Sequence, residues 1–137
     1  DAFLHIFLYA LQEELEENSN DPSVQKYYSA FSGLRTQIYN NPANNWSIPA
    51  LADSLALSLS YFQHLYKQFF TCSCQQDIIS ARLELAKYYL TGSDMSIRSL
   101  SDFCGYDNEL HFMRQFKKFV GMTPTEYRQK CAFIRRA

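Results

Sequence analysis

The chain has 137 residues and a formal net charge of −1, and 16% of its residues are aromatic. Four glycines and four prolines leave little room for the many turns of an all-β fold, and no apolar run is long enough to cross a membrane. We therefore expect a compact helical protein, too short for a large multidomain enzyme. No cleavable signal sequence is evident, and our interpretation is a cytoplasmic protein with reduced cysteines and no membrane partner.

The charges are unevenly distributed along the chain. Residues 1–22 carry six acidic groups and no Lys or Arg, whereas residues 55–137 carry eleven basic and seven acidic groups. Basic surfaces are typical of chains that contact nucleic acid. The C-terminal part is therefore the candidate for such contact, although the total charge is close to zero.

Residues 1–20 predict an amphipathic helix, because their apolar residues recur at helical spacing and acidic residues follow them. We interpret this helix as the tail of an upstream sensor or dimerisation domain, with a coiled linker from a receiver domain as the alternative. Its apolar stripe is either a homodimer contact, which we favour, or the edge of the upstream domain. The candidate dimerisation residues are Phe3, Phe7, Leu11 and Leu15. Residues 21–40 hold a linker, where Pro22 disfavours helix at Asp21, and then a helix over 24–40.

The second half of the chain contains one pattern twice. Residues 47–57 and 96–106 match at a constant offset of 49 residues. After one extra residue in the second copy, the match continues into two basic amphipathic helices. The identical pairs are Ser47/Ser96, Ile48/Ile97, Leu51/Leu100, Asp53/Asp102, Phe62/Phe112, Lys67/Lys117 and Phe69/Phe119. A short helix, a tight connection and a second helix make up a helix-turn-helix unit.

The repeat predicts two helix-turn-helix units, at 41–72 and 93–137 with the C-terminal helix, joined by a linker helix over 73–92. The predicted fold class is all-α, since no segment reads as a strand. Helix starts are expected at the N-cap residues Ser47, Ser58 and Ser96, and Gly105 and Gly121 are expected at a tight turn and a helix end. We also predict that Phe112, Phe116 and Phe119 all face the core.

Two segments resemble a known family. Asp107–Arg128 (DNELHFMRQFKKFVGMTPTEYR) resembles the C-terminal signature of the AraC/XylS family of bacterial transcription regulators, and Ser80–Leu90 (SARLELAKYYL) resembles its linker helix. The resemblance covers about residues 34–137. It implies two subdomains that dock in successive major-groove segments of duplex DNA, and an upstream domain that senses a small-molecule effector. The first copy departs from the family pattern at His64, Ala56, Thr71, Cys74 and Asp77.

The outward faces of the second helix in each unit supply the candidate DNA-binding residues. Arg114 can donate to guanine O6 and N7, histidines can contact base edges, and Leu110 can meet a thymine methyl group. Lysines suit phosphates, which fix register without reading sequence. The base-edge candidates are Ser60, Tyr61, Gln63, His64, Leu110, His111 and Arg114, and the phosphate candidates are Lys67, Lys117, Lys118, Ser47 and Ser96.

The leading hypothesis is a sequence-specific transcription regulator, an activator that binds an operator and recruits RNA polymerase. One alternative is an oligomerisation or protein-interaction module with weak DNA binding. A second, implied by the resemblance, is the DNA-binding part of a DNA-alkylation repair enzyme. Cys72 and Cys74 have no second Cys or His pair at zinc spacing, so we expect no metal, no cofactor and no catalytic residue within the chain.

Overall fold

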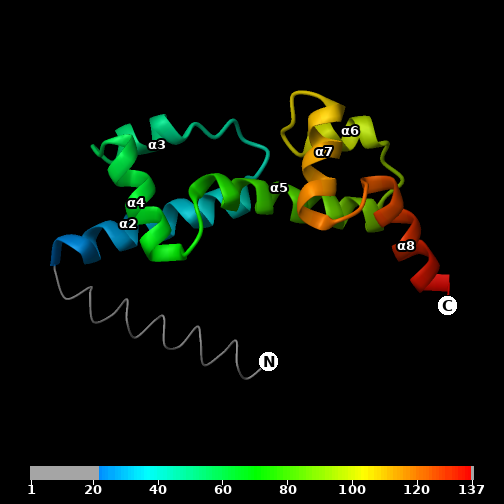
Figure 1. The fold of residues 1–137 in the computed structure, drawn as a ribbon, viewed down its shortest axis with the longest axis horizontal. Coiled ribbons are helices and arrows are strands. Elements are labelled where there is room, and N and C mark those ends of the chain that lie inside the picture. Colours follow the sequence, from blue (N-terminus) through cyan, green and yellow to red (C-terminus); the bar gives the residue numbers. More distant parts are fainter. Residues whose placement is uncertain (1–21, 137) are drawn as a thin grey trace, which may run out of the picture.

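The computed structural model describes residues 22–136, which form seven α-helices and no strand. The helices are α2 (Pro22–Asn40), α3 (Ile48–Ser54), α4 (Leu59–Phe70), α5 (Cys74–Gly92), α6 (Ile97–Phe103), α7 (Glu109–Val120) and α8 (Pro124–Arg136), shown in Figure 1. The predicted all-α class is confirmed, with two helix-turn-helix units along a long central helix. The helix predicted at 1–20, with Phe3, Phe7, Leu11 and Leu15, lies outside the described residues. Within the described residues, no helix is both long and apolar enough to span a membrane.

Local capping explains where the helices of both units begin. The N–H groups of Ala50 and Ser99 donate to the hydroxyls of Ser47 and Ser96, at 3.4 and 3.1 Å. These bonds satisfy N–H groups that the first helical turn leaves without a partner. At α4 the cap is Ser58, and at α7 it is the side chain of Asn108. The predicted serine caps are confirmed.

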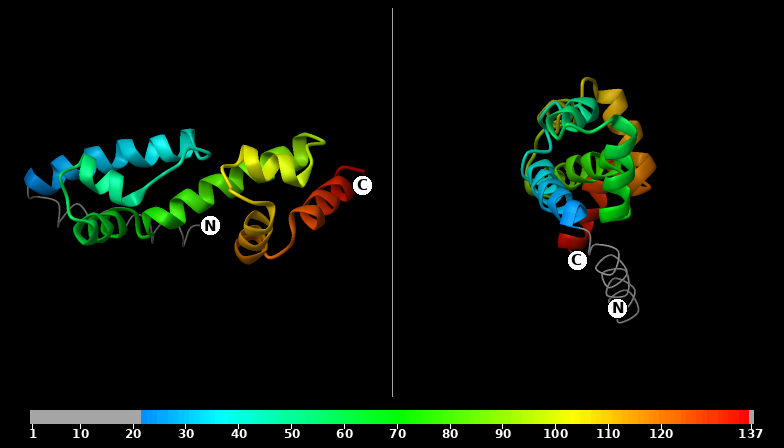
Figure 2. Two further views of the ribbon diagram at one scale, coloured as in Figure 1. Left: turned by 90° about the horizontal axis from the view of Figure 1, so that it is seen from above. Right: turned by 90° about the vertical axis from the view of Figure 1, so that its left-hand side faces the viewer.

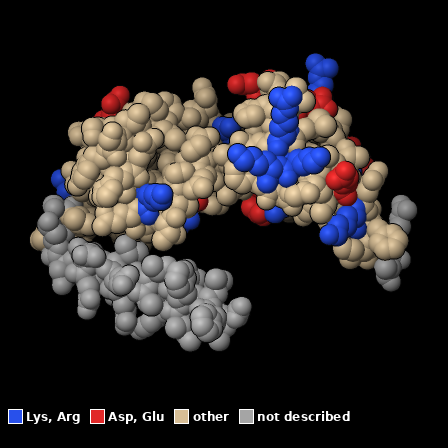
Figure 3. All heavy atoms as spheres, viewed as in Figure 1, with Lys and Arg blue, Asp and Glu red and all other residues tan. Residues whose placement is uncertain are grey.

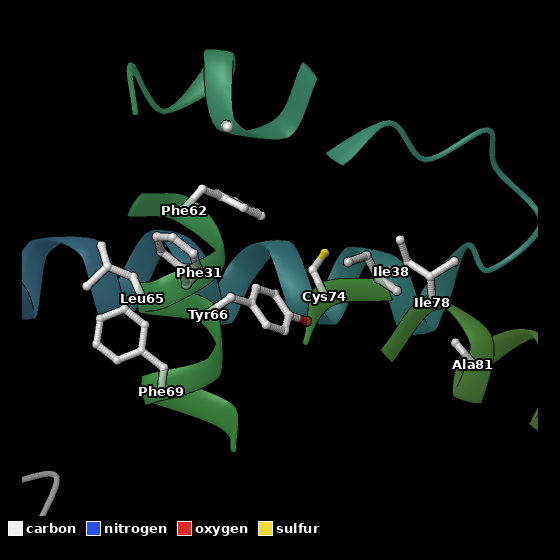
Figure 4. Close-up of a cluster of buried hydrophobic side chains, with 10 residues drawn as sticks. Phe31, Ile38, Phe62, Leu65, Tyr66, Phe69, Cys74, Ile78 and Ala81 are labelled. Atoms are coloured by element: carbon white, nitrogen blue, oxygen red, sulfur yellow. The ribbon is translucent and has the colours of Figure 1, made fainter. Parts of the chain in front are cut away.

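Helix α5 is the central element, and it contributes to two separate apolar cores. Ile78 and Ala81 pack into the first core with α2, α3 and α4. In Figure 4, Phe31 of α2 packs against Phe62 of α4, and their ring centroids are 5.0 Å apart. The second core takes Ile79, Leu83, Ala86 and Leu90 from α5, together with side chains of α6 and α7. Each helix-turn-helix unit thus has its own core on the same helix.

A buried carboxylate on α5 joins α2 to α4. Asp77 on α5 is only 3% exposed. It accepts hydrogen bonds from Arg35 Nε at 2.8 Å, the Tyr66 hydroxyl at 2.6 Å and the Tyr39 hydroxyl at 3.0 Å. Burial disfavours the ionised form, but the hydrogen bonds from Arg35, Tyr66 and Tyr39 outweigh it, so the pKa of Asp77 lies below its ordinary value. This departure from the family pattern therefore has a full set of polar partners.

The prediction that Phe119 faces the core is wrong. Its side chain is 48% exposed, and the Lys118 ammonium lies 5.5 Å from the centre of its ring. In the first unit the equivalent Phe69 is buried because Tyr28 and Phe31 of α2 pack on it, each at 5.4 Å. In the second unit, α8 instead covers Phe116, through Tyr127 at 5.7 Å.

Both units use left-handed backbone at the same two positions, the turn and the end of the second helix. In the second unit these are Gly105 at φ +90° and Gly121 at φ +91°. In the first unit Ala56 at φ 55° and Thr71 at φ 62° occupy them. A Cβ atom is disfavoured in this conformation, most of all on a β-branched residue. The first unit therefore adopts the same backbone conformation at both positions, although Ala56 and Thr71 disfavour it.

Thr71→Gly should raise the free energy of unfolding by about 1 kcal/mol, because glycine adopts this conformation without the clash between Cβ and the carbonyl oxygen. The reverse change, Gly121→Ala, should lower it by about 1 kcal/mol, since an added Cβ meets no atom within 4 Å and only the backbone conformation opposes it. Equilibrium urea unfolding measures both changes. A less stable Thr71→Gly variant would contradict the strain argument.

Asp77→Asn should lower the free energy of unfolding at neutral pH by about 3 kcal/mol, because it leaves the partly buried guanidinium of Arg35 without its counter-charge. Since the pKa of Asp77 is depressed in the folded state, its contribution is complete above about pH 4 and is lost as pH falls through that lower pKa. The wild type should therefore lose stability below about pH 4 more steeply than the variant.

Urea unfolding across this pH range provides the measurement. Asp53→Asn, at an exposed aspartate of α3, is the control and should change the unfolding free energy by less than about 0.5 kcal/mol. Equal acid sensitivity of the wild type and Asp77→Asn would show that the carboxylate does not contribute in this way.

Candidate nucleic-acid interface

The second helix of each unit, α4 and α7, lies on the same side of the molecule. In Figure 1 both cross the line of α5 and run from top to bottom, and in Figure 2 (left) both are seen nearly end-on along one edge. Each buries its apolar face in its own core, through Phe62, Leu65, Tyr66 and Phe69 in α4 and through Phe112 and Phe116 in α7. Their opposite faces are consequently presented to solvent together.

On α4 the predicted residues form one exposed face. The structure places five of them there, all exposed: Ser60, Tyr61, Gln63, His64 and Lys67. The Tyr61 ring packs edge-on against Tyr27 of α2, with 6.4 Å between the centroids, so α2 restricts its orientation. This face carries one lysine and one imidazole, and its other side chains are neutral hydrogen-bonding groups.

On α7 the predicted face is also exposed. It consists of Leu110, His111, Arg114, Lys117 and Lys118. The imidazole of His111 packs edge-on against the buried Tyr106 ring, with 5.4 Å between the centroids. Leu110 is 55% exposed, so its side chain is accessible on this face.

The two faces differ in charge density. Figure 3 shows Lys and Arg side chains gathered over α7 and only sparse ones over α4. The sequence accounts for the difference, because α7 carries Arg114, Lys117 and Lys118 where α4 has Lys67 alone. A polyanion would therefore experience most of its attraction at the second unit.

Ser47 and Ser96 lie at the starts of α3 and α6 and not on α4 or α7. Their hydroxyls accept the capping N–H groups described above, and Ser96 also donates to the Ser99 hydroxyl at 2.9 Å. Both side chains remain exposed. Arg98, in the first turn of α6, is an exposed cation beside Ser96 that we did not predict, because a single Arg in a short helix has no pattern.

A family model described as a helix-turn-helix domain matches residues 51–130. The arabinose operon regulatory protein of Escherichia coli is 33% identical over 88 residues, covering 64% of this chain and 30% of that protein. The transcriptional regulator GadX of Escherichia coli is 31% identical over 97 residues, covering 71% of this chain and 35% of that protein. The matched stretch is thus about a third of the length of either relative.

The fold is also found in a solved structure. The DNA-binding domain of AdpA, crystallised in complex with a target DNA, matches 77% of this chain and 96% of its own chain with a TM-score of 0.72. The sequence identity is 19%, so the similarity concerns the fold.

Proposed function

The chain belongs to the AraC/XylS family of helix-turn-helix transcription regulators, and from that premise we propose that it binds duplex DNA with α4 and α7 in successive major-groove segments. The observation that carries this proposal is the pair of equivalent helices on one side of α5, each with a buried apolar face and an exposed polar face. An α-helix fits the major groove, where the four base pairs present distinguishable donors and acceptors.

The residues divide into two roles in this mode of binding. Arg114 and His111 on α7, and His64, Gln63, Tyr61 and Ser60 on α4, would face base edges, with Leu110 available to a thymine methyl group. Lys67, Lys117 and Lys118 would neutralise phosphates, and the hydroxyls of Ser47 and Ser96 at the starts of α3 and α6 would donate hydrogen bonds to phosphate oxygens. The second unit would supply most of the electrostatic affinity.

The regulatory part of the proposal goes further. We expect the DNA-bound protein to activate transcription by contact with RNA polymerase in the bacterial cytoplasm. The signal would be sensed by a part of the protein outside these residues, since the matched stretch is about a third of the length of each relative. The stripe of Phe3, Phe7, Leu11 and Leu15 stays a proposed dimer contact. Transcription in vitro tests the activator role, with a promoter that carries a binding site selected from random duplexes. Less transcript in the presence of the protein than in its absence would contradict that role.

Repair chemistry by a reactive cysteine finds no support in the described residues. Burial raises the pKa of the Cys74 and Cys104 thiols to about 12, and burial also raises the pKa of Cys72. Such thiols stay protonated near neutral pH and are poor nucleophiles. The two relatives described above are named as regulators.

The protein should bind a duplex recovered by selection from a random pool, with an affinity that falls steeply as salt rises, because phosphate contacts release counterions. Lys117→Ala should make the slope of log affinity against log salt shallower by about 1 and weaken binding to all sequences alike. Lys87→Ala is the control, since Lys87 lies on α5 and pairs with Glu84 at 3.1 Å. Fluorescence anisotropy at several salt concentrations measures the slopes. A failure of the wild type to bind any selected duplex would overturn the proposed function.

Arg114→Ala should weaken binding to the selected duplex by about 1–3 kcal/mol and relax the preference at one base pair, because its guanidinium would no longer donate to guanine O6 and N7. Repeating the selection with the variant measures the base preferences directly. A variant that loses affinity equally for all sequences would instead place Arg114 on a phosphate.

A further inference from the structure

The loop between α2 and α3 is held by a side chain of α5. Arg82 donates from Nε to the Pro42 carbonyl at 2.9 Å and from Nη2 to the Asn44 carbonyl at 3.0 Å. Within the loop, the Trp46 indole N–H donates to the Asn41 carbonyl at 2.9 Å. Arg82 thus fixes the path of the chain just before α3, the first helix of the first unit.

The same loop touches the turn of the second unit. A Cβ atom on Gly105 would lie 2.7 Å from the Ala43 carbonyl oxygen and 2.9 Å from Ala43 Cα. The two backbones are therefore in direct contact, with no room for a side chain between them. The guanidinium carbon of Arg82 also lies 5.5 Å from the centre of the Tyr106 ring, next to Gly105, within the range of a cation–π contact.

Tyr106 continues this chain of contacts to the helix α7. Its hydroxyl donates to Gln115 Oε1, and its ring packs against His111 at 5.4 Å and Phe112 at 5.2 Å. A continuous path of contacts therefore runs from loop residues 42–44, through Arg82 and Tyr106, to α7, where it reaches His111, one of the residues that face DNA in the proposed mode.

These contacts close a ring between the two units. Without them, the units would be joined chiefly through α5, and each core would remain intact because each has its own apolar residues. With them, the units are attached at a second place, which opposes bending and twisting between α4 and α7. We propose that Arg82 is a positioning residue that sets the spacing and rotational phase of the two recognition helices, and thereby the spacing of the two base-pair segments that the protein accepts.

This inference rests on the proposed function and adds a requirement on operator geometry. One inserted base pair moves the second segment by about 3.4 Å and rotates it by about 35°. A protein whose two units are held rigidly then loses the contacts of one recognition helix or must deform the DNA. A protein whose units can move relative to one another can place both helices on the altered duplex.

The test uses the duplex selected with the wild-type protein and derivatives with one or two base pairs inserted between the segments that footprinting assigns to α4 and α7. The proteins are the wild type, Arg82→Met and the control Lys87→Met, which removes one positive charge from the same helix. The readout is the ratio of affinities for the original and the one-base-pair-inserted duplex. This ratio cancels any general loss of affinity or stability.

We expect a ratio of about ten or more for the wild type and Lys87→Met, and about three or less for Arg82→Met. An unchanged ratio in Arg82→Met would overturn the inference, as would a wild type that binds all spacings equally. If Arg82→Met lacks a native circular dichroism spectrum, the same ratio is measured with Arg82→Lys. A lysine keeps the positive charge but lacks the guanidinium group that donates to two carbonyls at once. An Arg82→Lys ratio equal to the wild type would then overturn it. A wild type that binds none of these duplexes would instead defeat the proposed function.

Discussion

The sharing of α5 between two cores is the constraint on which the rest of the structure depends. Neighbouring residues of this helix point into different cores, Ile78 into the first and Ile79 into the second. Because an α-helix turns by about 100° per residue, side chains one position apart project in clearly different directions. One helix can therefore carry two units and keep their second helices on the same side. The distance along α5 between the cores then limits how far apart those helices lie.

A shared helix alone leaves rotation and bending open, and polar contacts supply the remaining restraints. Asp77 attaches α2 to the first unit through Arg35, Tyr39 and Tyr66. Arg82 attaches the following loop and brings it against Gly105 of the second unit. Both residues lie on α5 and both bind groups from residues 35–44. The contacts of residues 35–44 thus restrain the positions of α4 and α7 relative to α5.

The two copies of the unit keep one backbone geometry but differ in chemistry. Ala56 and Thr71 adopt the left-handed conformations of Gly105 and Gly121, so the tertiary fold overrides local preference in the first copy. The exposed faces differ as well, since α7 carries three cations and α4 carries one. In the proposed mode of binding, α7 supplies most of the electrostatic affinity and contacts bases through Arg114 and His111, whereas α4 contacts bases through neutral hydrogen-bonding groups and His64. The differences in side chains leave the left-handed backbone at both positions of the unit in place.

The sequence by itself determined the helices, their caps and the exposed faces of α4 and α7. Capping by Ser58 and the 3.6-residue period of Phe62, Leu65, Tyr66 and Phe69 act within a few residues and are visible in the chain. Only the tertiary structure decided that Phe69 is covered while its counterpart Phe119 is exposed, because the cover comes from α2. The same holds for Asp77 and Arg82, whose partners in α2 and in the following loop lie 38 to 42 residues away along the chain. Helical periodicity predicts which face of a helix is apolar, but it does not predict which side chains from distant parts of the chain pack against that face.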